Sequence, residues 1–132
     1  MMISTRGRYA LRVMVDLAER DTEEYVALRE IAESQDISEK YLEAIVKRLV
    51  REGLIRGTRG KGGGYKLSKK TNQYTVGSIL KAADESLAPV ACLETEKNSC
   101  ERADICKVLP MWEKLNVMID NFFEGITLDM LV

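Results

Sequence analysis

Apolar residues recur at intervals of three and four along three segments near the start of the chain, a pattern that predicts amphipathic helices. The segments are residues 5–19, 28–35 and 38–52. Ser38 is a good N-cap for the third helix, and Gly53 follows it at the C′ position that glycine favours. A short helix, a turn of about three residues and a longer helix are the pattern of a helix-turn-helix.

Two short runs after the third helix, residues 54–56 and 64–67, predict the strands of a β-hairpin. The tip between them is rich in glycine and carries Arg59 and Lys61, so its backbone and charges could approach a phosphate closely. We interpret this hairpin as the wing of a winged helix, with an ordinary flexible loop as the alternative. A nucleotide-binding glycine loop is disfavoured because no P-loop lysine–serine/threonine pair is present.

The rest of the chain predicts two further helices with a loop between them. Residues 75–84 favour a helix, Pro89 begins a loop, and a long helix follows over residues 110–123. The apolar face of this last helix is wider than a small domain needs, so it packs either on a partner subunit or on its own core. Its candidate dimer-interface residues are Trp112, Leu115, Ile119 and Phe122.

These elements give a mainly α fold with a small β-hairpin: a winged helix-turn-helix domain plus a long C-terminal dimerisation helix. We expect the DNA-binding domain to span residues 1–80, and the cysteine loop and dimerisation helix to span residues 81–132. The chain has 132 residues, of which 45% are hydrophobic and 31% charged, as in globular proteins. No apolar run approaches the roughly 20 residues of a membrane span, and the N-terminus has no signal-peptide pattern, so we expect a cytoplasmic protein.

The net charge of −1 conceals an uneven distribution. Residues 40–70 contain ten basic and two acidic side chains, a local net charge of +8, whereas residues 76–132 contain five basic and ten acidic, a net charge of −5. A basic block in an acidic protein is a candidate footprint for nucleic acid. A solvated surface face is the alternative, but this block coincides with the predicted helix-turn-helix and wing.

The third helix and the hairpin tip supply the candidate DNA contacts. Residues near the N-terminus of a recognition helix usually meet base edges, and Glu43 could accept a hydrogen bond from cytosine or repel phosphate. Basic residues further along suit phosphate contacts, and Arg59 suits a narrow minor groove. Tyr41 could instead be a half-buried helix residue. The candidates are Ser38, Lys40, Tyr41, Glu43, Lys47, Arg48, Arg51, Arg59 and Lys61.

All three cysteines of the chain, Cys92, Cys100 and Cys106, fall in the predicted loop. Their odd number argues against a closed set of disulfides. Thiolates at such spacing suit an iron–sulfur cluster or a soft metal, in a compartment where thiols stay reduced. Three unrelated thiols, or a redox pair with a bystander, are the alternatives.

Five stretches resemble the Rrf family of bacterial winged-helix transcription regulators, in particular its iron–sulfur cluster-sensing branch. They are S-T-R-G-R-Y-A-L-R at residues 4–12, I-S-E-K-Y-L-E at 37–43, R-G-K-G-G-G-Y at 59–65, T-V-G-S-I-L at 75–80, and the three cysteines followed by Trp112. The resemblance covers nearly the whole chain. It implies a homodimer that binds double-stranded promoter DNA, and a cluster held by Cys92, Cys100 and Cys106, with 2Fe-2S favoured and 4Fe-4S possible.

The sequence departs from the family pattern at the fourth cluster ligand. The pattern places a histidine three residues after the last cysteine, where this chain has Leu109, and the chain contains no histidine. The nitric-oxide-sensing branch recruits a carboxylate where this chain has Arg8. The fourth ligand would then come from a partner subunit, from a small thiol, or from a loop carboxylate. The loop carboxylates are Glu94, Glu96, Glu101 and Asp104.

The favoured function is therefore an iron–sulfur cluster-dependent transcription regulator of cluster-assembly or iron-homeostasis genes. The alternative is a cluster-free regulator of the same family that responds to thiol oxidation or nitric oxide. An enzyme is disfavoured because no nucleophile–base pair is recognisable.

Overall fold

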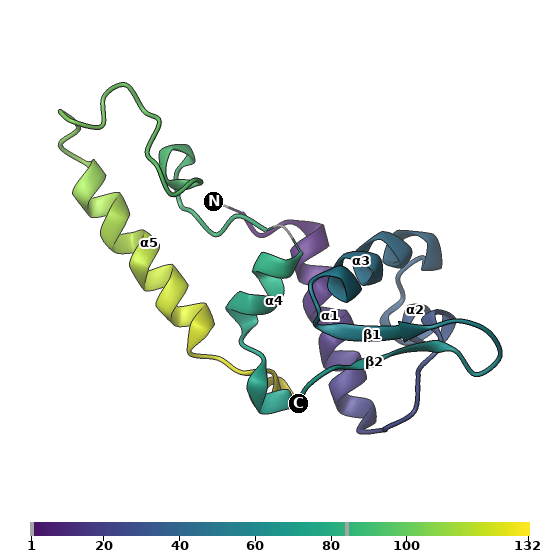
Figure 1. Ribbon diagram of the computed structural model, residues 1–132. Coiled ribbons are helices and arrows are strands. Elements are labelled where there is room, and N and C mark those ends of the chain that lie inside the picture. The colour runs from purple at the N-terminus through teal and green to yellow at the C-terminus, as the bar shows by residue number, and fades with distance from the viewer. Residues whose placement is uncertain (1, 84) are drawn as a thin grey trace.

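The computed structural model describes residues 2–83 and 85–132 (Figure 1). Its elements are, in chain order, α1 (Thr5–Arg20), α2 (Leu28–Gln35), α3 (Glu39–Arg51), β1 (Ile55–Thr58), β2 (Gly64–Leu67), η1 (Thr71–Gln73), α4 (Val76–Ala82), η2 (Ala91–Leu93), α5 (Leu109–Glu124) and η3 (Leu128–Leu131). The prediction of a mainly helical fold with one β-hairpin is confirmed.

The helix-turn-helix forms because local signals fix both ends of α3. The Ser38 hydroxyl accepts a hydrogen bond from the Tyr41 amide at 3.1 Å, so the predicted N-cap is confirmed. Gly53 has a φ of 78°, and the Leu54 amide donates to the Leu49 carbonyl at 2.9 Å. This closing pattern is a Schellman motif, which ends the helix and turns the chain into the wing.

The wing is an antiparallel pair in which Ile55 lies opposite Leu67 and Thr58 opposite Gly64. The first strand was predicted as residues 54–56, but it begins one residue later because Leu54 belongs to the turn after α3, and it continues to Thr58. Val26 extends the sheet by one bridge, exchanging both backbone hydrogen bonds with Tyr65 at 2.8 Å. The root of the wing is therefore fixed to the segment between α1 and α2.

The hydrophobic core lies between α1, α2, α3 and α4 and receives a residue from the far end of the chain. Met14, Ile31, Leu42 and Ile79 are fully buried in it, and so is Leu128 of η3. The Leu128 amide donates to the carbonyl of Tyr74 at 3.0 Å, and Thr75 forms an isolated β-bridge with Thr127. The C-terminal segment thus returns from α5 to the winged-helix core.

Figure 1 shows α5 and the loop before it extending away from the winged-helix body. The predicted helix at residues 75–84 is α4, which Thr75 caps, while Asp84 lies outside the described residues. Residues 85–108, here called the cysteine loop, contain one short 3₁₀ turn, η2. No helix in the described part of the chain is long and apolar enough to cross a membrane.

Candidate nucleic-acid interface and cysteine loop

The outward face of α3 carries the predicted DNA contacts. Ser38 and Glu43 lie exposed on its N-terminal half, and Arg48 is half-buried further along. The remaining candidates on α3, all exposed, are Lys40, Tyr41, Lys47 and Arg51. The structure therefore places the predicted contacts other than Arg59 and Lys61 on α3 and its N-cap, on an accessible surface such as a recognition helix requires.

Tyr41 is 44% exposed, but its ring is held from one side. It meets the ring of Tyr9 edge to face, with centroids 5.5 Å apart. The Arg12 guanidinium lies 5.2 Å from the Tyr9 ring centroid and also donates to Gln35. Packing of this kind, from α1, orients the Tyr41 hydroxyl while leaving it accessible.

Arg6 of α1 belongs to the same surface, although sequence reasoning did not select it. It lines a shallow hollow with α3 residues that include Ser38, Tyr41 and Lys47. Its Nε donates to the Ala83 carbonyl at 2.7 Å, which ties the first turn of α1 to the end of α4. The available signal was the presence of three arginines, Arg6, Arg8 and Arg12, within the first helix.

The wing supplies a second basic surface. Arg59 and Lys61 are exposed at its tip, which Figure 1 shows projecting beyond the helices. Gly60 and Gly62 have φ values of 90° and 78°, a left-handed backbone that other residues adopt at a cost. The glycines predicted to permit close backbone approach therefore shape the turn itself.

Tyr74 fixes the base of the wing. Its ring is buried, and its hydroxyl donates to the Leu54 carbonyl at 2.7 Å while accepting from the amides of Ser68 and Lys69, each at 2.9 Å. Burial raises the pKa of Tyr74 above its usual value of 10.0, although the two amide hydrogen bonds and Arg56 oppose this rise. One side chain thereby closes the ends of β1 and β2 onto the core.

The three cysteines are free thiols in the cysteine loop, with Cys92 and Cys106 half-buried and Cys100 exposed. The loop's hydrogen bonds between residues 90 and 105 in the described structure are local, joining positions no more than three residues apart. Across residues 2–83 and 85–132, no three metal-binding side chains converge on one point. The expected convergence of the three sulfur atoms is thus not present in this conformation.

The donor set of the loop nevertheless fits an iron–sulfur cluster or a soft metal, because three free thiols, none of them fully buried, share one segment whose hydrogen bonds are local. Leu109 begins α5 and offers no donor atom. Arg8 instead donates to Thr5 at 3.1 Å. Four exposed carboxylates of the loop could supply an oxygen ligand: Glu94, Glu96, Glu101 and Asp104.

Glu85 attaches the start of the cysteine loop to the DNA-binding domain. Its carboxylate accepts hydrogen bonds from both the amide and the hydroxyl of Ser4, the N-cap of α1. A Cβ on Gly7 would lie 2.7 Å from a Glu85 oxygen, so the small residue makes room for this carboxylate. The carboxylate also lies at the positive end of the α1 dipole, where negative charge is favoured.

The apolar side chains of α5 divide into two stripes rather than one wide face. The inner stripe faces the chain's own body, where Ile119 and Phe123 pack on Val76, Leu80 and Leu87. The outer stripe is exposed and repeats at alternating intervals of three and four, the spacing of a coiled-coil seam. Its residues are Val108, Met111, Leu115, Met118 and Phe122.

The predicted interface residues fall on both sides of this division. Leu115 and Phe122 belong to the outer stripe, whereas Ile119 packs within its own chain and Trp112, two turns before it on α5, is half-buried. Within α5, all of which the structure describes, no residue is buried. The helix therefore retains an unpartnered apolar surface.

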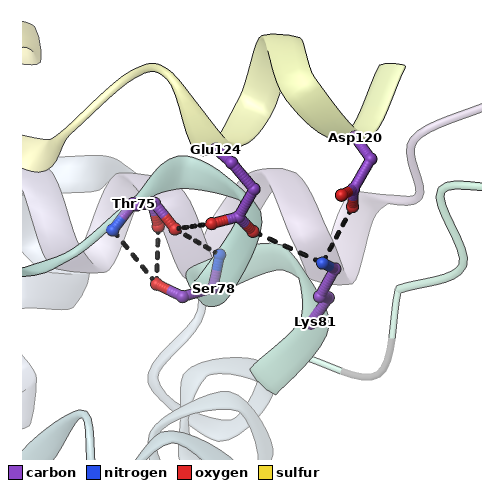
Figure 2. Close-up of polar contacts among 5 residues, drawn as sticks. All are labelled: Thr75, Ser78, Lys81, Asp120 and Glu124. Carbon is purple, nitrogen blue, oxygen red and sulfur yellow. Dashed lines mark hydrogen bonds and ion pairs between the residues drawn. The ribbon is translucent and has the colours of Figure 1, made fainter. Parts of the chain in front are cut away.

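Polar contacts join the C-terminal half of α5 to α4 (Figure 2). Lys81 lies 2.9 Å from an Asp120 oxygen and 3.3 Å from a Glu124 oxygen, and the Thr75 hydroxyl donates to Glu124 at 2.9 Å. We refer to Thr75, Lys81, Asp120 and Glu124 as the clamp. The hydrogen bond from Lys81 to Asp120, followed by that to Glu124, raises the pKa of Lys81 above 10.5 despite partial desolvation.

The fold and these surfaces define a winged-helix regulator, and comparison with known proteins identifies its family. The model of the Rrf2 family, described as an iron-dependent transcriptional regulator, matches residues 3–132. The chain belongs to the Rrf2 family. It is a DNA-binding transcription regulator and not an enzyme, as its family and relatives indicate.

Individual relatives agree with this assignment. The HTH-type transcriptional regulator IscR of Pectobacterium atrosepticum is 41% identical over 132 residues, which are the whole of this chain and 79% of that protein. The structure of CymR, the global cysteine regulator of B. subtilis, matches with a TM-score of 0.79 and 31% identity, over 99% of this chain and 95% of that one. The structure of T. potens IscR matches with a TM-score of 0.78 and 31% identity, over 99% of this chain and 85% of that one.

Proposed function

We propose that this chain is an iron–sulfur cluster-responsive regulator that binds promoter DNA as a homodimer and controls genes of cluster assembly or iron homeostasis. The observation that carries the proposal is the cysteine loop. It gathers every thiol of the chain into one weakly tethered segment, whose start contacts α1 through Glu85 and whose end leads into α5. A ligand that reorganised this loop would therefore act on both attachments.

Cys92, Cys100 and Cys106 would hold the cluster through their thiolates, with 2Fe-2S favoured and 4Fe-4S possible. When bound, the cluster supplies redox chemistry and ligand lability that make it a sensor. The fourth ligand would come from a loop carboxylate or from a group of the partner. Glu85 keeps the start of the loop beside the first turn of α1. The relatives named IscR and the family description as iron-dependent support this proposal.

The DNA contacts belong to the same proposal. Ser38, Tyr41 and Glu43 would meet base edges, while Arg59 and Lys61 would follow the minor groove and the adjacent phosphates. Lys40, Lys47, Arg48 and Arg51 would contact phosphates. Each of the two copies would present one such surface, held in place by pairing of the outer stripes of α5.

The test is anaerobic purification of the wild type and of Cys92→Ala, Cys100→Ala and Cys106→Ala, with iron and sulfide counted and visible absorption recorded. We expect a coloured wild type and loss of stable cluster in each variant. Full cluster occupancy in one variant would remove that cysteine from the site. A colourless, iron-free wild type after anaerobic reconstitution would refute cluster dependence.

A cluster-free thiol regulator is the second candidate, and a specific observation favours it. A structural neighbour with a TM-score of 0.79 is a global cysteine regulator, and the cysteines of this chain are free thiols. In that case, oxidation would change DNA affinity without iron. DNA binding that responds reversibly to oxidant and dithiothreitol in metal-free protein would support this candidate, and an absent response would exclude it.

A further inference from the structure

The direction of α5 relative to the winged helix rests on few contacts. Its N-terminal half extends away from the body, and its C-terminal half packs on α4 (Figure 1). The apolar part of this contact is the packing of Ile119 and Phe123 against Val76 and Leu80. Because the hydrophobic effect is not directional, this packing holds the two helices together without fixing the angle between them. The backbone bridge between Thr75 and Thr127 fixes the position of the C-terminal end of α5, so a second contact along the helix is needed to set the angle between α4 and α5.

The clamp has the geometry to set this angle. Glu124 uses one oxygen toward the N-cap hydroxyl of Thr75 and the other toward Lys81, two turns of chain further along α4. Lys81 reaches Asp120 as well, one turn back along α5. Figure 2 shows the four side chains converging from the two helices. Two attachment points on each helix define a direction, whereas one point would permit rotation.

Gly77 shapes the seat of this clamp. A Cβ at position 77 would lie 2.3 Å from one Glu124 oxygen and 2.9 Å from its carboxyl carbon. Thr75 also forms a capping box with Ser78, so its hydroxyl is oriented before it meets Glu124. The site on α4 is thus built to receive a carboxylate, although the surrounding surface is open to solvent.

The clamp also connects α5 to the wing through the neighbour of Thr75. Tyr74 accepts from the Leu128 amide beyond α5, and its hydroxyl holds Leu54 and Lys69 at the wing's base. The helix that carries the exposed outer stripe and the wing that carries Arg59 are therefore attached to adjacent residues. A change of angle at the clamp would move one relative to the other.

We propose that Thr75, Lys81, Asp120 and Glu124 are positioning residues that set the spacing of DNA half-sites the dimer accepts. This inference rests on the proposed homodimer. When two copies pair through α5, the angle between α5 and its own winged helix determines how far apart the two recognition helices lie. Half-site separation must match that distance along the duplex, so a loosened clamp would broaden the accepted spacing.

The experiment measures spacing preference directly. The probes are a duplex selected from a random pool by the wild-type protein, its single half-site, and versions with one base pair added to or removed from the centre. The variants are Lys81→Met, Glu124→Gln and Gly77→Ala. Glu113→Gln is the matched control, because Glu113 is exposed on α5 outside the clamp. Lys81→Arg tests rescue by a cation that can still reach both carboxylates.

We expect Lys81→Met to bind the full site about tenfold more weakly, in the range of a one-base-pair defect, and to lose most of its discrimination among the three spacings. Half-site binding should stay within about twofold of wild type, since the recognition helix is untouched. Gly77→Ala should shift in the same direction through displacement of Glu124. Lys81→Arg and Glu113→Gln should match wild type.

Two contrary outcomes are distinguishable. If the wild type shows no spacing optimum, the proposed dimeric DNA binding fails and the clamp's role fails with it. If the wild type has an optimum and Lys81→Met keeps it, or if half-site and full-site affinities fall equally, the clamp is only structural and the inference is overturned. Sedimentation of each variant separates loss of the dimer from loss of spacing preference.

Discussion

The winged-helix domain and the C-terminal arm, residues 85–124, differ in how far they expose the same types of apolar residue to solvent. Met14 in the first is 0% exposed, whereas Met118 in the second is 67% exposed. The one buried charged residue, among those the structure describes, is Asp16, and it is fully paired. The arm has its apolar side chains on an open surface and its thiols in a loop with local hydrogen bonds. The first region buries its apolar side chains in a common core, whereas the second leaves an apolar stripe and its thiols at the surface.

This difference separates two kinds of variant. Changes in the winged helix should alter folding or DNA contacts in a single chain, and changes in the arm should alter assembly while the winged helix stays folded. A substitution that affected both equally would show that the two regions are one cooperative unit.

The largest expected effect is on assembly. Met118→Glu places a charge in the middle of the outer stripe, where burial against a second copy would cost several kcal/mol. We expect the protein to sediment as a monomer at micromolar concentration with unchanged helix content. Val117→Glu is the matched control, because Val117 is 57% exposed but lies outside the outer stripe, so this change should leave the dimer intact. A dimeric Met118→Glu would remove the outer stripe from the interface.

The next effect is on the stability of the winged helix. Asp16 is 3% exposed and accepts from Arg20 at 2.8 Å, from Ser34 at 2.5 Å and from Gln35 at 3.0 Å. Asp16→Ala would leave these donors without their acceptor, and we expect a loss of about 2–3 kcal/mol in the free energy of unfolding. Glu19→Ala, an exposed change on the same helix, should be nearly neutral. If Asp16→Ala and Glu19→Ala lowered the free energy of unfolding equally, the Asp16 hydrogen bonds would contribute little to stability.

The pH dependence of Asp16 has a definite sign. Burial by itself would raise the pKa of this carboxyl, but the hydrogen bonds from Ser34, Arg20 and Gln35 outweigh it and lower the pKa below 3.8. The ionised form is thus favoured in the folded state. Its contribution is present above the unfolded value near 3.8 and is lost as the pH falls through the folded pKa. In Asp16→Ala, the free energy of unfolding should therefore fall less steeply than in the wild type as the pH is lowered through this range.

Much of the winged helix could be predicted because its signals are local. The three helices follow the spacing of apolar residues, and Ser38 and Gly53 mark the ends of α3 by their own chemistry. The wing followed from its glycines and two short runs, but the first strand was predicted one residue too early at its start and two residues too short at its end. In these elements the residues that determine the structure are neighbours in sequence.

The arm and its attachments depend on residues far apart in sequence, so periodicity could not reveal them. Thr75 meets Glu124, and Leu128 fills the core beside α1, through contacts that no local pattern encodes. The apolar residues of α5 were correctly identified, but their division into inner and outer stripes depends on where α4 lies. Spacing placed the three cysteines in one loop, yet it could not give the loop's conformation.

A smaller effect concerns DNA binding alone. Arg59→Ala removes one cation from the exposed wing tip of each copy, and we expect binding to weaken by about 1–2 kcal/mol, with the log–log salt slope of the proposed dimer reduced by about two. Lys97→Ala, an exposed change in the cysteine loop, is the control and should leave the slope unchanged. An unaltered slope for Arg59→Ala would remove the wing tip from the phosphate contacts.

The smallest expected effect lies at Tyr74, where the two regions meet. Tyr74→Phe removes the bond to the Leu54 carbonyl and the acceptor for two amides, at a cost of about 1 kcal/mol near neutral pH. The raised pKa of Tyr74 adds a pH signature: its contribution to the free energy of unfolding is complete below the unfolded value of 10.0 and is lost as the pH rises through the folded pKa.

The raised pKa of Lys81 acts in the same direction above 10.5, so two groups should make the wild type less stable as the pH rises into the alkaline range. Tyr74→Phe should retain only the Lys81 part, and Lys81→Met only the Tyr74 part. Denaturant titrations at several pH values, with Tyr25→Phe as control, measure these slopes, and identical alkaline slopes in wild type and Tyr74→Phe would contradict the assignment.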